Sequence, residues 1–112
     1  MERFIKGDVV VIPFPYSDLT NAKRRPALVL AASSHNDLIL CQITSQDIED
    51  SFAIKLSDDD FTQGGLKKLS NIRPNKLFTA DSGIILYKIG SLKPQKLHDV
   101  IDSIVEIIKD KS

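Results

Sequence analysis

Residues 23–30 read Lys-Arg-Arg-Pro-Ala-Leu-Val-Leu, and this stretch gives the strongest structural signal in the chain. Three adjacent cations are followed by a proline and then by apolar residues of the kind that form a buried β-strand. Pro26 fixes its own φ angle and favours an extended backbone at Arg25. We therefore expect Arg25 at the mouth of a strand over about residues 26–32, where its planar guanidinium can bind two phosphate oxygens. A solvated basic loop before the strand is the alternative that this stretch leaves open.

Short strands are also predicted on either side of this stretch. Alternating or β-branched apolar segments, bounded by turn residues, predict strands at about residues 8–14, 37–44, 52–56, 69–77 and 84–88. Ser57 and the three aspartates after it predict a single capped helical turn. The segment Gln63-Gly64-Gly65 predicts a loop.

The last segment of the chain has a helical period instead. Its apolar residues recur three and four positions apart and are Leu97, Val100, Ile101, Ile104, Val105 and Ile108. Pro94 suits the first turn of such a helix. We expect the helix to close a core rather than to carry chemistry. Six strands and one terminal helix predict a mainly β (α+β) fold, a small, strongly bent barrel or half-barrel capped by the helix.

Composition indicates one ordinary globular domain. The 112 residues, 42% apolar and 27% charged, suffice for a single core, so we expect one domain over residues 1–112. No apolar run approaches the roughly 20 residues of a membrane span. The charged N-terminus lacks an apolar signal core. Cys41, the single cysteine, lies in an apolar run, and we expect it to be a small buried residue of a cytoplasmic protein rather than a nucleophile.

The net charge is zero, but the charges are segregated along the chain. Acidic residues gather at Asp47, Glu49, Asp50, Asp58, Asp59 and Asp60. Basic residues gather at Lys23, Arg24, Arg25, Lys67, Lys68, Arg73 and Lys76. If the fold brings the two basic groups together, the protein has one positive face that suits nucleic acid.

Several kinds of chemistry find no support in the sequence. His35 and His98 stand far apart without ligand spacing, so no metal site is predicted and both are expected to be surface or structural residues. The pair Gly64-Gly65 lacks the lysine of a phosphate-binding loop. No serine lies in the elbow motif of a hydrolase.

The remaining candidate site combines two arginines and a threonine. Thr44 ends the apolar run over residues 38–43, so its hydroxyl is expected where a strand leaves the core. Arg73 precedes Pro74 and repeats the arrangement of Arg25 and Pro26. Two arginines anchored in this way favour a phosphate site.

Four segments follow one another along nearly the whole chain in a recognisable order. They are Gly-Asp-Val-Val at 7–10, Arg-Arg-Pro-Ala-Leu-Val at 24–29, Cys-Gln-Ile-Thr-Ser-Gln at 41–46 and Ile-Arg-Pro-Asn-Lys-Leu-Phe-Thr-Ala-Asp at 72–81. Together they resemble the PemK/MazF family of type II toxins.

The resemblance implies an SH3-like or CcdB/PemK-type barrel that forms a homodimer. It also implies sequence-selective cleavage of single-stranded RNA (mRNA) without metal or other cofactor, leaving a 2′,3′-cyclic phosphate and a 5′-hydroxyl. The family's catalytic arginine and threonine fall on Arg25 and Thr44. Some members also use an Arg-x-Asp motif, which here corresponds to Arg73 and Asn75, and asparagine cannot act as a general acid or base. The implied partner is a cognate antitoxin whose acidic segment occupies the RNA groove, with DNA binding through that complex.

Binding of single-stranded RNA also requires cations and aromatic side chains on which bases stack. Tyr16 is the preferred aromatic candidate, and Phe14 and Phe78 are the others. The residues expected to bind RNA are Tyr16, Lys23, Arg24, Gln46, Ser70, Arg73, Asn75 and Lys76.

Two other functions stay open at this stage. A non-catalytic inhibitor of DNA gyrase, like the related CcdB toxins, would not depend on Arg25 and would use the terminal helix. An RNA-binding module that has lost cleavage is the second alternative, and Asn75 is the only residue that suggests it.

Overall fold

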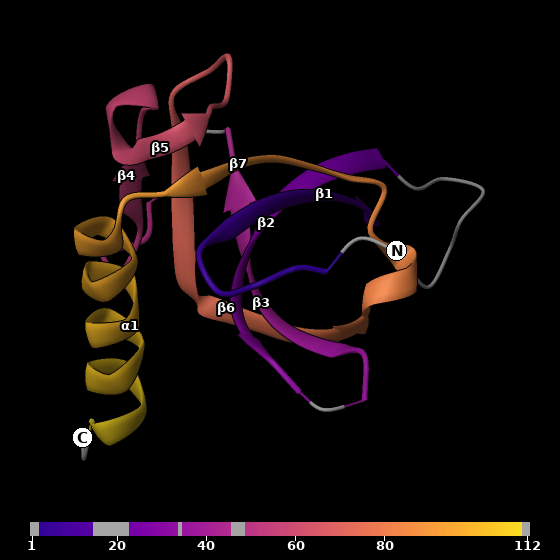
Figure 1. The fold of residues 1–112 in the computed structure, drawn as a ribbon. Helices are drawn as coiled ribbons and strands as arrows, with labels where there is room; N and C mark the ends of the chain where they lie inside the picture. Colours follow the sequence, from indigo (N-terminus) through magenta and orange to yellow (C-terminus); the bar gives the residue numbers. More distant parts are fainter. Residues whose placement is uncertain (1–2, 15–22, 34, 46–48, 111–112) are drawn as a thin grey trace.

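A computed structural model describes residues 3–14, 23–33, 35–45 and 49–110. In chain order its elements are β1 (Asp8–Phe14), β2 (Lys23–Ala32), β3 (Asp37–Thr44), β4 (Ile54–Leu56), the 3₁₀ turn η1 (Asp58–Asp60), β5 (Phe61–Gly64), β6 (Ser70–Asp81), the 3₁₀ turn η2 (Ser82–Ile84), β7 (Tyr87–Leu92) and α1 (Pro94–Lys109). The mainly β fold with a C-terminal helix is confirmed (Figure 1). The capped turn predicted after Ser57 is η1, and Ser57 donates its backbone N–H to the Asp60 carboxylate at 2.9 Å.

The strands form one antiparallel sheet in the order β4-β6-β3-β2-β1-β7-β5. β1, β2 and β3 lie at its centre and pair as sequential neighbours. β6 then pairs with β3 on one side, and β7 pairs with β1 on the other. The sheet curls strongly, and α1 stands along one side of it (Figure 1). This arrangement is the bent half-barrel that the sequence predicts.

β6 turns sharply near its middle (Figure 1). Cys41 of β3 pairs with Leu77, whereas the next residue, Gln42, pairs with Arg73. Residues 74–76 of β6 therefore have no counterpart on β3. Pro74 lies in this irregular segment, where a residue without a backbone N–H is tolerated in a sheet. As a result, the two halves of β6 pair with the two halves of β3 in different registers.

Several strand boundaries differ from those predicted. β2 begins at Lys23, so the basic residues before Pro26 belong to the strand, and the solvated-loop alternative is wrong. β1 extends far enough to pair with them, as Phe14 does with Lys23. β6 continues to Asp81, and β7 starts only at Tyr87. The side chain of Asp81 accepts the N–H of Gly83 at 2.7 Å and starts η2, which delays β7.

The loop predicted at residues 63–65 is also partly wrong, because β5 extends through Gly64. β5 pairs with β7, and Gly64 lies opposite Gly90 in that pair. Gly64 has a φ of 71°, and a Cβ at this position would collide with the carbonyl oxygen of Ile89. These glycines permit the close approach of two backbones. In the sequence the same residues are also typical of a loop.

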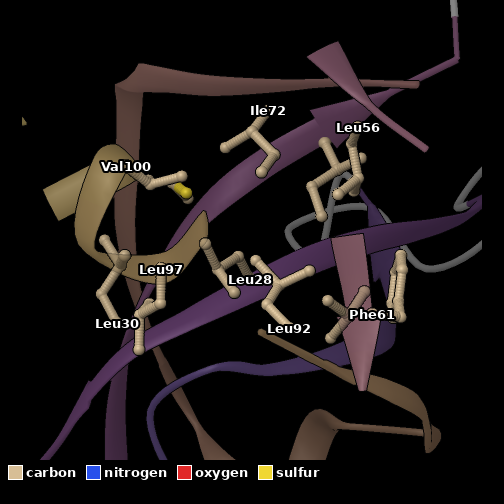
Figure 2. Close-up of a cluster of buried hydrophobic side chains, with 11 residues drawn as sticks. Leu28, Leu30, Leu56, Phe61, Ile72, Leu92, Leu97 and Val100 are labelled. Carbon is tan, nitrogen blue, oxygen red and sulfur yellow. The ribbon is translucent and has the colours of Figure 1, made fainter. Parts of the chain in front are cut away.

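Apolar side chains fill both faces of the central strands, since successive residues of a strand point to opposite sides. The first cluster lies between the sheet and α1 and consists of Val9, Leu28, Leu30, Cys41, Ile43, Leu56, Phe61, Ile72, Leu92, Leu97 and Val100. Figure 2 shows Leu97 and Val100 of α1 reaching toward Leu28 and Leu30 of β2. The prediction that the terminal helix closes a core is confirmed.

The second cluster covers the opposite face of the same strands. It consists of Phe4, Val10, Ile12, Ala27, Val29, Leu38, Leu40 and Ala80. The middles of β1, β2 and β3 are thus buried on both sides. Side chains for binding or chemistry can therefore be presented only where these strands leave the two clusters.

Candidate functional site

One face of β2 changes from apolar to cationic within two residues. Ala27 and Val29 point into the second cluster. By the alternation of a strand, Arg25 and Lys23 lie on the same face of β2, beyond the apolar part. Arg25 is half-buried, whereas Lys23 and Arg24 are exposed. Pairing with Ile12 of β1 holds the backbone of Arg25 in place.

Thr44 lies at the corresponding end of β3. Gln42 pairs with Ala27 of β2, and Thr44 follows it on the same face. The pairing of β2 with β3 ends at Ala27 and Gln42, and Arg25 and Thr44 each lie two residues beyond it on the same face of their strands. Thr44 is a buried polar residue, 8% exposed, at the last position of β3.

β6 adds a second arginine to this face. Arg73 pairs with Gln42, and Asn71 pairs with Thr44. Three neighbouring strands, β2, β3 and β6, therefore present a common group of polar side chains. We call this group the polar face, and its members are Arg25, Gln42, Thr44, Asn71 and Arg73. The two arginines and the threonine singled out in the sequence thus share one side of the sheet.

Asp50 binds Arg73 at the edge of the polar face. Its Oδ2 accepts from Nη2 of Arg73 at 3.2 Å and from Nε at 3.4 Å. Its Oδ1 accepts the backbone N–H of Phe52 at 3.0 Å. The side chains are 10% exposed for Asp50 and 22% for Arg73. The ion pair is therefore largely shielded from solvent.

The surroundings of Asp50 favour its ionised form. The hydrogen bond from the Phe52 N–H lowers the pKa of Asp50 most, and burial opposes it. The hydrogen bond and the charge of Arg73 lower the pKa further, as does a hydrogen bond from Asn75. In the sequence, Asp50 is one of a group of acidic residues and has no feature that marks it as a site residue. An aspartate that accepts an N–H two residues later is typical of a turn. Its partner lies 23 positions away, which no local pattern indicates.

The other predicted RNA-binding residues lie in different places. Asn75 and Lys76 are exposed in the bend of β6. Ser70 is buried opposite Leu56, on the other side of β6 from Arg73, and its hydroxyl donates to the Lys68 carbonyl at 3.1 Å. Tyr16 and Gln46, together with the side chain of Phe14, lie outside the described residues.

Two further residues extend the polar face. Lys55 of β4 pairs with Asn71, and it is exposed. Phe78 of β6 is half-buried against the second cluster. Sequence reasoning missed Lys55 because β4 is short and its pairing partner comes 16 residues later.

Residues excluded from chemistry on sequence grounds take structural or surface positions. Cys41 is buried, and burial raises the pKa of its thiol to about 12. His35 and His98 are exposed. Among the described residues there is no group of three or more side chains that could hold a metal ion. Across the same ranges, the structure has no helix with the length and apolarity of a membrane span.

Solved structures with this fold come from several bacteria. MazF from Deinococcus radiodurans superposes with a TM-score of 0.76 at 18% identity, covering 98% of this chain and 100% of that one. MazE-MazF from the same organism gives a TM-score of 0.74 at 18% identity, covering 97% and 98%. An endoribonuclease in complex with its cognate antitoxin from Mycobacterial species gives 0.73 at 10% identity, covering 95% of each chain. These likenesses establish the fold. Curated protein sequences give no significant match.

Fold and site together define a small, curled β-sheet protein with arginines gathered on one sheet face. The sequence profile of the PemK-like, MazF-like toxins of type II toxin-antitoxin systems matches residues 5–108. The chain therefore belongs to this family.

Proposed function

We propose that this protein is the toxin of a type II toxin-antitoxin pair and acts as an endoribonuclease on single-stranded RNA. The observation that supports this most is the common placement of Arg25, Thr44 and Arg73 on three adjacent strands. A phosphodiester has one negative charge shared by two non-bridging oxygens, and guanidinium groups and hydroxyls are suited to bind these oxygens. Membership of the toxin family supports the same activity.

In the proposed reaction, the ribose 2′-hydroxyl loses its proton and its oxygen bonds to the adjacent phosphorus, while the bond from phosphorus to the 5′-oxygen breaks and that oxygen takes up a proton. The products are a 2′,3′-cyclic phosphate and a 5′-hydroxyl, and no metal ion takes part. Negative charge grows on the phosphoryl oxygens in the transition state. Arg25, held by its β1 partner, stabilises that charge. Thr44 donates a hydrogen bond to a phosphoryl oxygen or orients the 2′-hydroxyl.

Arginine keeps its proton in water, since its pKa lies above about 12. We therefore assign Arg25 to charge stabilisation rather than to proton transfer. Arg73 binds a phosphate beside the reacting one. Lys23, at the start of β2, and Lys55, on the edge strand β4, lie on the same face and extend the positive surface along the RNA backbone.

The proposed partners are a cognate antitoxin and a second copy of the chain. Structural relatives are described as MazE-MazF and as an endoribonuclease with its cognate antitoxin. An acidic antitoxin segment would complement the arginines of the polar face and exclude RNA. A homodimer would cover apolar side chains at the far end of β3 and β6, where Ile39 is 45% exposed and Leu77 is 41% exposed. We propose that the toxin acts in the cytoplasm, where mRNA is present.

The test is cleavage of a long single-stranded RNA in EDTA by the wild-type protein and two variants, Arg25→Ala and Arg24→Ala. Both changes remove one cation from neighbouring positions of β2, but the two side chains point to opposite faces of the sheet. We expect Arg25→Ala to slow cleavage by about 10²- to 10³-fold, as does loss of a group that stabilises an oxyanion. We expect Arg24→Ala to slow it by less than about tenfold, because a cation on the other face adds only to the general attraction of the RNA backbone.

The outcomes separate the proposed function from its alternatives. Discrete cuts with cyclic-phosphate ends, lost only with Arg25→Ala, support the proposal. RNA that is bound but left intact would favour a binding module. A folded protein that neither binds nor cuts RNA would point to a protein target such as gyrase. Equal losses for both arginines would contradict the assignment of the site to one sheet face.

A further inference from the structure

The contact between Asp50 and Arg73 has a specific geometry. The Asp50 carboxylate engages Nε and Nη2, which form the side edge of the guanidinium. A guanidinium has a second edge, formed by Nη1 and Nη2, with N–H groups that point in another direction. The contact with Asp50 therefore fixes the direction of the second edge and leaves it unused by this carboxylate.

Asp50 is itself held by the backbone. The Phe52 N–H binds its Oδ1, and the Asp50 carbonyl oxygen accepts the N–H of Ala53 at 3.1 Å. The segment that carries Asp50 thus forms a tight turn just before β4. Arg73 has four side-chain bonds of free rotation, and an anchored carboxylate restricts them. A preorganised guanidinium binds an anion with a smaller loss of entropy.

We infer that Asp50 is a positioning residue of the RNA site, which holds the free edge of Arg73 toward a backbone phosphate on the polar face. This inference rests on the proposed function, because the phosphate is that of the RNA substrate. Asp50 touches neither the reacting atoms nor the phosphate. It acts through Arg73, which shares the face of Arg25 and Thr44.

Two other roles fit the observations less well. A general base takes up a proton most efficiently when its pKa lies near the working pH. The pKa of Asp50 is lowered by the Phe52 N–H and by Arg73, and both carboxylate oxygens already accept hydrogen bonds. A purely stabilising role fits less well too, because in a shielded ion pair the cost of removing both charges from water offsets much of their attraction.

If Asp50 positions Arg73, removing its charge should change the affinity for RNA in the direction opposite to that expected from charge repulsion alone. Removing an acidic residue near RNA normally strengthens binding, since one repulsive charge is lost. If Asp50 orients Arg73, its removal weakens binding instead. The sign of the change in affinity therefore distinguishes the two explanations.

The experiment has two measurements. The first is the Kd of a single-stranded DNA oligonucleotide, which can bind but cannot be cleaved because it lacks the attacking 2′-hydroxyl. The second is the single-turnover cleavage rate of the RNA of the same sequence. The variants are Asp50→Asn, Arg73→Ala, the double variant, and Asp59→Asn as a control for the loss of one exposed acid. We expect Asp50→Asn to raise the Kd about tenfold, the size of one charge-assisted hydrogen bond. We expect no further rise when Arg73→Ala is already present, and an unchanged or lower Kd for Asp59→Asn.

A further measurement does not depend on RNA. The NMR signal of the Arg73 Nε–H reports how fast the guanidinium rotates, and we expect slow rotation in the wild type and fast rotation in Asp50→Asn. Equal or tighter binding by Asp50→Asn, or a loss that persists in the Arg73→Ala background, would overturn the inference. If the wild type binds no nucleic acid, the proposed function fails. In that case, a guanidinium of Arg73 that rotates slowly in the wild type and fast in Asp50→Asn would still support the orienting contact. Fast rotation in the wild type as well as in Asp50→Asn would reject it.

Discussion

The two halves of β2 share a strand and a sheet face but differ completely in chemistry. In the half from Ala27 onward, side chains on this face pack into the second cluster and exclude water. In the half from Lys23 to Arg25, the same face carries cations at the protein surface. The apolar half fixes the backbone, and the cationic half uses that fixed backbone to hold a guanidinium. Stability and proposed function are therefore separated along the strand rather than across the sheet.

The largest expected effect tests whether the first cluster, on the other face of the apolar half of β2, is closed to solvent, because Cys41 of β3 lies in that cluster opposite Leu28. At pH 8, a thiol with a pKa of about 12 contains about a thousandfold less thiolate than one at the ordinary 9.0, and only the thiolate is reactive. We expect Cys41 of the folded protein to react with iodoacetamide at least about a thousandfold more slowly than in guanidinium. Rapid alkylation of the native protein would show that this region opens readily.

Leu40→Ala should affect stability and spare the chemistry of the polar face. Leu40 is fully buried in the second cluster, so its truncation should lower the free energy of unfolding by about 2 to 5 kcal/mol. Arg25→Ala should lower it by no more than about 1 kcal/mol, since Arg25 lies outside the cluster. Urea denaturation of both variants checks this. A larger loss of stability for Arg25→Ala would contradict the separation of the two halves.

Thr44→Val keeps the shape of a side chain at the border between the halves and removes its hydroxyl. We expect RNA cleavage to slow by about ten- to a hundredfold, as does loss of a hydrogen bond to a charged group. Thr79→Val is the matched control, because Thr79 is exposed on β6 and pairs with Ile39, away from the polar face. Single-turnover rates with one RNA measure both. Equal rates for Thr44→Val and the wild type would remove Thr44 from the proposed mechanism.

The smallest expected effect is a pH dependence of stability from Asp50. Its pKa in the folded protein is lowered below the ordinary 3.8, chiefly by the Phe52 N–H and then by Arg73. The ionised form is therefore stabilised above pH 3.8, and this stability is lost as the pH falls through the folded pKa. The difference in melting temperature between wild type and Asp50→Asn should be constant near neutral pH and shrink below pH 3.8. A difference that grows in acid would contradict the direction of the shift.

The sequence predicted what depends on local patterns. The helix over residues 94–109 and the strands at 8–14 and 37–44 follow from periodicity and turn residues, because burial of one apolar face imposes both. The alignment of Arg25, Thr44 and Arg73 follows from the ends of apolar runs and from the resemblance to the toxin family. Their roles in cleavage stay predictions.

The rest depends on contacts between distant segments. β5 was missed because Gly64 and its neighbours are typical of a loop, and only the approach of β7 makes them a strand. Asp50 was missed because its role depends on Arg73, which is adjacent to it only in the folded chain. The register change in β6 cannot be read from alternation, since Pro74 interrupts the strand without ending it.

The bend of β6 changes which side chains, odd-numbered or even-numbered, point to a given face of the sheet. Before the bend, odd-numbered residues such as Asn71 and Arg73 face the side of the site, and after it the even-numbered Phe78 and Ala80 face that side. The three unpaired residues at 74–76 produce this change because their number is odd. Shortening the segment by one residue would force one half of β6 to exchange its inner and outer side chains. The polar face therefore depends on the number of residues in the bend of β6 as much as on the identity of its arginines.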